Sequence, residues 1–365
     1  MRVALNGRFY AAPVTGVQRF AMEVAQRLPA RTEVLLMLPR GVAAPELDGV
    51  TVVTGRLRGH AWEQTEFPWR ARAARCDVCL SLSGTLPATG GPHVGVVHDV
   101  LPLTHPEWFS AAFAAWYRLA VGRNARRAAR VVTVSRWSAE QIARVLGIDP
   151  DHIVISTQGL TPFDVPASDT AVARVRKMYR LPARYVLAVG HGDPRKNVPF
   201  LIEVMREWRR RDEDAPGLVV VGRTSARVHG RMAEETSSEG VDVLGRVEDD
   251  QLQALYSGAA AFAFPSLAEG FGRPPLEALA CGAPAVVAPY GTAAEVLRDG
   301  AAIVPLDIDA WIAQLRAMVV EGQERSAWLA RGRMIARACN WDDAAAQVLG
   351  ACEDAAGRAP AALGV

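Results

Sequence analysis

The chain has 365 residues, half of them apolar, and its 41 basic and 39 acidic side chains leave a formal net charge of only +2. This length predicts two domains with sizeable cores, and the near-neutral balance argues against a nucleic-acid-binding protein. No apolar run reaches transmembrane length, and the opening MRVALNGRFY resembles a strand, so we expect neither a membrane span nor a signal peptide. Five cysteines, an odd number, fit a reducing cytoplasm.

The first half of the chain alternates predicted strands with helices. A short apolar strand at 2–7 precedes a loop with Gly16, and apolar residues then recur at helical spacing from Val17 to Leu28. In a doubly wound fold, a glycine-bearing loop between the first strand and its helix is the phosphate position. The loop lacks G-x-G-x-x-G, which argues against a dinucleotide enzyme. Further strands are expected at 33–38, 50–54, 78–82, 93–97, 131–134 and 152–156, with a helix over 62–74.

Two segments of this half have both a functional and a purely structural interpretation. Residues 62–64, Trp-Glu-Gln, either shape an acceptor pocket or place a buried tryptophan beside a polar face. Phe109–Arg130 is predicted to be one helix carrying aromatic and basic side chains. It either grips anionic lipid or a lipid diphosphate, or presents a solvated arginine face over packed aromatics. The pair Cys76-x-x-Cys79 is interpreted as buried strand cysteines rather than a metal site.

The strand at 93–97 ends in His98 and Asp99. Open α/β sheets place their ligands at the carboxyl ends of the strands. We therefore expect His98 to act within the functional site, with Asp99 orienting the imidazole or touching an acceptor.

The second half restarts the pattern after a polar segment at 158–167, which we interpret as a linker. A buried strand at 185–189 leads into the loop Gly190-His-Gly-Asp-Pro-Arg-Lys-Asn. Gly190 allows a close approach to a ligand, and Arg195 and Lys196 bring two positive charges to a strand end. A diphosphate leaving group needs neutralising charge at such a position. Lys196 is one of only two lysines in the chain.

A third loop lies between an apolar strand at 259–265 and a helix at 275–281 that begins with two prolines and ends at Gly282. Gly270 and Gly272 let the backbone approach a ligand, and the N–H groups near the helix start attract an anion. Glu269 and Glu277 are eight positions apart, so one carboxylate lies on the loop and the other early in the helix. Carboxylates are good acceptors for sugar hydroxyls. A nucleotide-sugar offers both groups: phosphates for the start of the helix and sugar hydroxyls for the carboxylates.

The segment Glu269-GFGRPPL-Glu277 resembles the E-x7-E signature of retaining GT-B glycosyltransferases, and its surroundings are similar to glycosyltransferase family 4. The resemblance implies that Glu269 faces the transferred sugar, that the Phe271–Gly272 backbone faces the diphosphate, and that Glu277 holds the ribose. It also implies that His98 contacts hydroxyls of the transferred sugar. Many relatives carry an arginine where this chain has His191.

The resemblance assigns the remaining positions as well. Lys196, followed by Arg195, would neutralise the departing diphosphate. Gly16 would face the donor phosphates and the acceptor, and the backbone at Val247 would contact the base. The expected catalytic residues are His98, Arg195, Lys196 and Glu269, and the expected donor-binding residues are Gly16, Gly190, Val247, Gly270, Phe271, Gly272 and Glu277.

The expected fold is α/β of the GT-B type, with two Rossmann-like, doubly wound domains facing across a cleft. An acceptor-binding domain is predicted at 1–165, a nucleotide-sugar-binding domain at 166–340, and a C-terminal helix crossing back to the first domain at 341–365. The expected reaction is retaining transfer of a hexosyl group from GDP-mannose or a UDP-sugar to a hydroxyl of a glycan or lipid-linked acceptor, in the biosynthesis of bacterial surface polysaccharide.

We expect no metal and no cofactor besides the nucleoside diphosphate sugar, and a cytoplasmic location with or without peripheral contact at the inner face of the membrane. A sugar-nucleotide epimerase of the same fold stays open as an alternative. So does a glycan- or nucleotide-binding protein without turnover. A pyridoxal-dependent phosphorylase is disfavoured, because the chain has only two lysines. The donor sugar and base, the acceptor and the oligomeric state are left open by the sequence.

Overall fold

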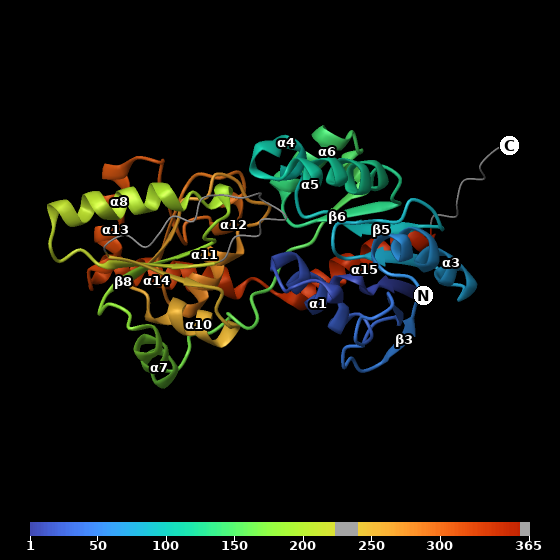
Figure 1. The fold of residues 1–365 in the computed structure, drawn as a ribbon, viewed down its shortest axis with the longest axis horizontal. Coiled ribbons are helices and arrows are strands. Elements are labelled where there is room, and N and C mark those ends of the chain that lie inside the picture. Colours follow the sequence, from blue (N-terminus) through green and yellow to red (C-terminus); the bar gives the residue numbers. More distant parts are fainter. Residues whose placement is uncertain (223–239, 358–365) are drawn as a thin grey trace. The chain divides into compact units, whose positions relative to one another are not determined.

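The computed structural model describes residues 1–222 and 240–357, which form two compact units, each built around one parallel sheet (Figure 1). The first unit contains residues 1–104, 114–159 and the chain from Asn340 onward. The second contains residues 105–113 and 160–339. Residues 105–113 thus group with the second unit, although they fall inside the predicted first domain. In the described part of the chain, no helix has the length and apolar composition needed to cross a membrane.

The sheet of the first unit has seven parallel strands in the order β3-β2-β1-β4-β5-β6-β7. The strand order reverses between β1 and β4, and ligands of open α/β sheets bind at the carboxyl ends of the strands at such a switch point. The strands are β1 Arg2–Asn6, β2 Glu33–Leu38, β3 Val50–Thr54, β4 Val78–Ser81, β5 His93–Val96, β6 Arg130–Thr133 and β7 Ile153–Ile155.

Helices cover this first sheet, and the last helix of the chain packs among them. The helix α15 contacts α1 and the strands β4 to β7. The side chain of Ser156 donates to the carbonyl of Ala344, and the side chain of Gln347 accepts from the amide of Thr157 at 2.9 Å. The helices are α1 Gly16–Arg27, α2 Gly59–Ala61, α3 Phe67–Ala73, α4 Leu101–Thr104, α5 Ala111–Tyr117, α6 Arg136–Leu146 and α15 Trp341–Gly357; shorter turns are η1 Gly7–Ala11, the π-helical η2 Trp62–Glu66, η3 Pro106–Trp108, the π-helical η4 Arg118–Arg123 and η5 Pro150–His152.

The sheet of the second unit has six parallel strands in the order β10-β9-β8-β11-β12-β13, and its order reverses between β8 and β11. The loops that follow these two strands are the ones that the sequence singles out. The strands are β8 Tyr185–Val189, β9 Gly217–Val221, β10 Val241–Gly245, β11 Ala261–Phe264, β12 Ala285–Val287 and β13 Ala302–Ile303. The helices are α7 Asp169–Tyr179, η6 Pro194–Lys196, α8 Val198–Arg211, α10 Asp249–Gly258, α11 Arg273–Cys281, α12 Ala293–Leu297, α13 Ile308–Val319 and α14 Gln323–Arg337.

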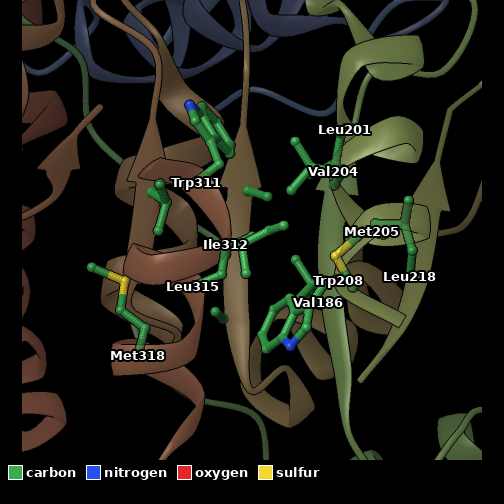
Figure 2. Packing of buried hydrophobic residues seen from close by; sticks show 14 of the residues in the cluster. Val186, Leu201, Val204, Met205, Trp208, Leu218, Trp311, Ile312, Leu315 and Met318 are labelled. Carbon is green, nitrogen blue, oxygen red and sulfur yellow. The ribbon is translucent and has the colours of Figure 1, made fainter. Parts of the chain in front are cut away.

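The main core of the second unit lies between its sheet and the helices α8 and α13 (Figure 2). Apolar residues at helical spacing, from Leu201 to Trp208 on α8 and from Trp311 to Met318 on α13, pack on Val186 of the sheet. Burying a large apolar side chain stabilises the fold by about 1.5–3 kcal/mol. This packing fixes α8, and with it the start of that helix at the carboxyl edge of the sheet.

The helix predicted over Phe109–Arg130 is shorter than expected: helical conformation runs without a break from 111 to 125, and Arg130 lies on a strand. The helix α5 ends at Tyr117, and a π-helical turn, η4, follows and includes Gly122. A π turn adds a residue to the helical repeat, so the arginine and aromatic faces that a regular spacing would give do not continue through it. Arg130 lies on β6, buried, with Nη2 3.2 Å from Asp354.

Candidate active site

The first loop of the site follows β8 and is shaped around one lysine. Gly190 has φ +120°, and a Cβ there would lie 2.4 Å from Cγ of Lys196. Only glycine therefore lets the lysine side chain cross this point of the backbone. Asp193 caps the turn η6 by accepting from the amide of Arg195 at 3.0 Å. The loop thus has a fixed conformation that delivers Lys196 to the switch point.

An ion pair joins this loop to the loop after β11. Lys196 Nζ lies 2.6 Å from Glu269 Oε1, with side-chain exposures of 13% and 10%. Ser266 Oγ donates to the same oxygen at 2.5 Å. The ammonium also lies 4.6 Å from the ring centroid of Phe264, within cation–π range. Within the described residues Glu269 Oε2 accepts no hydrogen bond, so this oxygen is available to a hydroxyl of a ligand.

Arg195 has a different environment from its neighbour. Its guanidinium pairs with Asp193, with Nη2 2.6 Å from Oδ2. Its carbonyl accepts from the amide of Leu267 at 2.7 Å, which ties the two loops together, and Ser266 Oγ lies 3.1 Å from the same carbonyl. The charge of Arg195 is therefore balanced within its own loop, whereas the lysine is paired with the carboxylate of the facing loop.

The start of α11 forms the third part of the site. Gly272 is the N-cap, with φ +83°, and Phe271 is buried with its carbonyl accepting from Thr292 Oγ1 at 3.2 Å. The first N–H groups of a helix have no intrahelical acceptor and attract anions. Because the prolines at positions 274 and 275 have no N–H, the amides at this end of the helix are those of Gly272 and Arg273.

Glu277 is buried on α11, and both of its carboxylate oxygens are engaged. Tyr256 Oη donates to Oε2 at 3.0 Å, and Arg273 Nε donates to Oε1 at 3.1 Å. Burial raises the pKa of Tyr256 well above its usual value, so the phenol stays a donor. A carboxylate oxygen has two lone pairs, so Glu277 retains capacity for a ribose hydroxyl. Neither Tyr256 nor Arg273 is among the predicted site residues, although the spacing of Arg273 and Glu277 is that of a helical ion pair.

The other predicted residues lie as follows. Val247 is half-buried and precedes Glu248, the N-cap of α10. Gly16 begins α1, where an added Cβ would meet nothing within 4 Å. His98 follows β5 and packs edge-on against Phe20, with ring centroids 5.1 Å apart. The second unit brings together Gly190, Arg195, Lys196, Glu269, Gly270, Phe271, Gly272 and Glu277 around its switch point, whereas Gly16 and His98 belong to the first unit.

A buried polar network, centred on Glu63, occupies the switch point of the first sheet. The carboxylate is 0% exposed, and Oε1 accepts from Asn6 at 2.9 Å, Arg8 at 3.1 Å and Thr85 at 2.6 Å. Oε2 lies 3.1 Å from His60 Nδ1. Burial alone would raise the pKa of Glu63, but these donors, His60 and Arg8 foremost, hold it below its usual 4.5.

The Glu63 network reaches the surface through two side chains. His60 is 45% exposed at its side chain and its ring lies 5.0 Å from that of Trp116, while Arg8 is half-buried. Of the neighbouring residues in the sequence, Trp62 is buried, and Gln64 clamps the loop after β4 by bonds to Leu86 and Ala88. Trp62 is therefore buried, as the structural interpretation of segment 62–64 expects. The segment also lies beside the polar surface formed by His60 and Arg8, so the acceptor-pocket interpretation stays open.

Comparison with known proteins gives two adjoining family matches. Residues 14–160 match the family described as Glycosyltransferase Family 4, and residues 176–334 match Glycosyl transferases group 1. The O-antigen chain mannosyltransferase B of Escherichia coli is 26% identical over 365 residues, covering 93% of this chain and 96% of the relative. The O-antigen chain mannosyltransferase RfbU of Salmonella typhimurium is 28% identical, covering 74% of each.

Solved structures share the fold at low identity. A glycosyltransferase from Rickettsia africae has a TM-score of 0.71 at 15% identity, covering 98% of this chain and 99% of that one. Sucrose-phosphate synthase from Thermosynechococcus elongatus has a TM-score of 0.69 at 18% identity, covering 96% and 97%. Anabaena HepE in complex with UDP and glucose has a TM-score of 0.68 at 17% identity, covering 97% and 98%. With two Rossmann-like units and both family matches, this chain has the GT-B fold and belongs to the group 1 glycosyltransferases of family 4.

Proposed function

We propose that this glycosyltransferase moves a mannosyl group from a nucleoside diphosphate mannose to a hydroxyl of a glycan or lipid-linked acceptor during assembly of a bacterial surface polysaccharide. The observation that carries the proposal is the Lys196–Glu269 pair, placed at the switch point beside the N-terminus of α11. The choice of mannose is supported by the names of the O-antigen relatives. Other hexosyl donors, UDP-sugars included, are the competing choice within the same proposal.

The chemistry follows from where charge develops. Cleavage of the bond between the anomeric carbon and the diphosphate oxygen leaves negative charge on the diphosphate, and preorganised donors stabilise that charge most effectively. Lys196 supplies a positive charge, and the amides of Gly272 and Arg273 supply oriented dipoles. These groups give the chain its own means of neutralising the leaving group, so we propose that transfer needs no metal ion.

Glu269 is proposed to hold the sugar. Its Oε1 is committed to Lys196 and Ser266, and its Oε2 is left to accept from sugar hydroxyls. The acceptor oxygen would bond to the anomeric carbon on the face that the diphosphate leaves, and its proton would pass to a phosphate oxygen. This course retains the configuration and requires no nucleophile from the protein.

The acceptor is proposed to bind at the first unit, over the surface formed by Arg8, His60 and Trp116. Their positions are fixed from beneath by the Glu63 network and by the ring contact of His60 with Trp116. An aromatic face beside fixed donors suits a sugar, which has both an apolar face and hydroxyl groups.

Contact with a membrane is proposed through η4 and the residues just after it, rather than through the whole of Phe109–Arg130. Leu119 is 62% exposed there, with basic side chains around it. Each basic side chain near an anionic surface contributes about 1 kcal/mol. The exposed basic residues are Arg118, Arg123, Arg126 and Arg127. Arg123→Ala should weaken co-sedimentation with anionic vesicles roughly fivefold, whereas Arg337→Ala, at an exposed position of the second unit, should not.

A donor panel tests the central proposal. Transfer and hydrolysis are assayed with GDP-mannose and with UDP- and dTDP-sugars, with and without a chelator, and the rise in melting temperature with each nucleotide is recorded. Lys196→Ala should lower turnover about a hundredfold or more, and Lys177→Ala on α7 is the matched control. Near-normal turnover of Lys196→Ala would refute the assigned role. Release of an isomerised sugar nucleotide would identify an epimerase, and binding without turnover a non-catalytic protein.

A further inference from the structure

Tyr290 lies just after β12 and carries a hydroxyl that the fold does not use. The residue is 4% exposed, and its ring packs edge-on against Phe264, with centroids 5.7 Å apart. Within the described residues, the buried Oη has no hydrogen-bond partner. A buried hydroxyl without a partner lowers the stability of a fold, and phenylalanine would fill the same space without that loss. The hydroxyl therefore calls for an explanation outside the free protein.

The hydroxyl is aimed at the start of α11. A Cβ placed on Gly272 would lie 2.5 Å from Tyr290 Oη and 3.0 Å from Cζ. The backbone of Tyr290 is held on both sides, since its amide donates to Ala288 and its carbonyl accepts from Ala293, each at 2.9 Å. The phenol is thus a fixed group that reaches the N-cap of a nine-residue helix, and Gly272 places no side chain of its own there.

The state of the phenol decides which ligand it fits. Burial, with the negative charge of Glu269 adding to it, raises the pKa of Tyr290 well above its usual value. The group therefore keeps its proton at neutral pH and offers an O–H donor. An anionic oxygen is the partner that gains most from such a donor, and the start of a helix is where anionic oxygens bind.

We propose that Tyr290 Oη donates a hydrogen bond to an oxygen of the donor's diphosphate, as a binding residue of the site at the start of α11. The inference rests on the proposed function and adds a side-chain donor to the lysine and backbone amides already placed there. It also gives Gly272 a second reason to be glycine, because any side chain at that position would displace the phenol.

Tyr290→Phe tests the proposal, because it removes one oxygen and leaves the packing against Phe264. We titrate GDP and UDP into wild type and variant and measure binding by calorimetry. Guanosine and uridine, the nucleosides without phosphate, are titrated in the same way as controls. We expect the affinity for the nucleoside diphosphate that wild type binds to fall roughly tenfold, and the affinity for its nucleoside to stay unchanged. The melting temperature of the free variant should equal or exceed that of wild type.

A matched control is Tyr179→Phe on α7, whose hydroxyl donates to Gln251 at 2.7 Å. This variant should bind nucleoside diphosphates as wild type does. Unchanged diphosphate affinity in Tyr290→Phe overturns the inference, as does an equal loss for diphosphate and nucleoside. A lower melting temperature of free Tyr290→Phe together with unchanged affinity identifies the hydroxyl as structural. If wild type itself binds no nucleoside diphosphate, the proposed function fails, and this inference fails with it.

Discussion

Each unit places a buried glutamate at the switch point of its sheet, but the two carboxylates are used differently. Glu63 in the first unit is 0% exposed and has four donors shared over both oxygens. Glu269 in the second unit is also buried, yet both of its donors converge on Oε1. Within the described residues, Oε2 of Glu269 accepts no hydrogen bond.

This difference in hydrogen bonding indicates that the carboxylate of Glu63 stabilises the fold, whereas that of Glu269 can still accept a hydrogen bond from a ligand. A buried charge with a full set of donors fixes the loops that supply those donors, and its removal leaves them unpaired. A buried charge with an unused oxygen gives up part of that stabilisation and keeps a group ready for a substrate, as binding sites commonly do. Glu63 therefore positions Arg8 and His60, whereas Glu269 keeps an oxygen for the sugar that we propose it binds.

The largest expected effect is on stability, at Glu63. Glu63→Ala should lower the free energy of unfolding by about 3–5 kcal/mol, because it leaves the half-buried guanidinium of Arg8 and the buried donors Asn6 and Thr85 without their acceptor. Urea denaturation at pH 7 measures the change. Glu46→Ala, at an exposed loop position, is the control and should have little effect. A loss below about 1 kcal/mol at Glu63 would show that the network does not stabilise the unit.

Glu269→Gln should show the opposite pattern. The amide oxygen can still accept from Lys196 and Ser266, but the ammonium of Lys196 loses its counter-charge, so we expect the free energy of unfolding to fall by about 1–3 kcal/mol, less than at Glu63. The charge-assisted bonds to the sugar are lost, and turnover with the best donor should fall roughly ten- to hundredfold. Steady-state kinetics and urea denaturation of one preparation give both numbers. Large losses of stability with little change in turnover would reverse the assigned roles.

Much of this arrangement could be predicted from sequence because the signals are local. Apolar runs ending in glycine-bearing loops located the strands on both sides of each switch point, and proline at 274 and 275 marked the start of α11. The structure shows that Lys196 Nζ lies 2.6 Å from Glu269 Oε1. The roles of the two residues were inferred from a family resemblance and stay predictions.

The residues that sequence reasoning missed depend on tertiary packing. Tyr256 reaches Glu277 from another helix, and Tyr290 reaches Gly272 from beyond the next strand, so no spacing in the chain relates them. The helix predicted at Phe109–Arg130 was too long, and its π segment was missed, because a π turn does not alter composition and the pattern of apolar residues does not reveal it in so short a segment.

Gly272→Ala should have an intermediate effect and test the site at the start of α11. Gly147, the C-cap of α6, is the matched control: it has φ +63° against +83° at Gly272, and an added Cβ there would meet nothing within 4 Å. Backbone strain alone should lower the free energy of unfolding by about 1–3 kcal/mol in each variant. Gly272→Ala also displaces Tyr290, so it alone should reduce the melting-temperature shift given by a nucleoside diphosphate. Equal shifts in both variants would contradict the placement of the diphosphate.

The smallest effect is the dependence of the Glu63 contribution on pH. The pKa of Glu63 is lowered in the folded protein, so the unfolded chain binds a proton first as the pH falls below about 4.5. The stabilisation is therefore present in full above that value and is lost progressively as the pH falls through the folded pKa. Each unit of pKa difference corresponds to about 1.4 kcal/mol. The stability difference between wild type and Glu63→Gln, from urea denaturation, should be constant between pH 7 and 5 and should shrink between pH 4.5 and 3. A difference that stays constant down to pH 3 would mean that folding leaves the pKa of Glu63 unchanged, and the contrast with Glu269 would then rest on hydrogen bonds rather than on a stabilised charge.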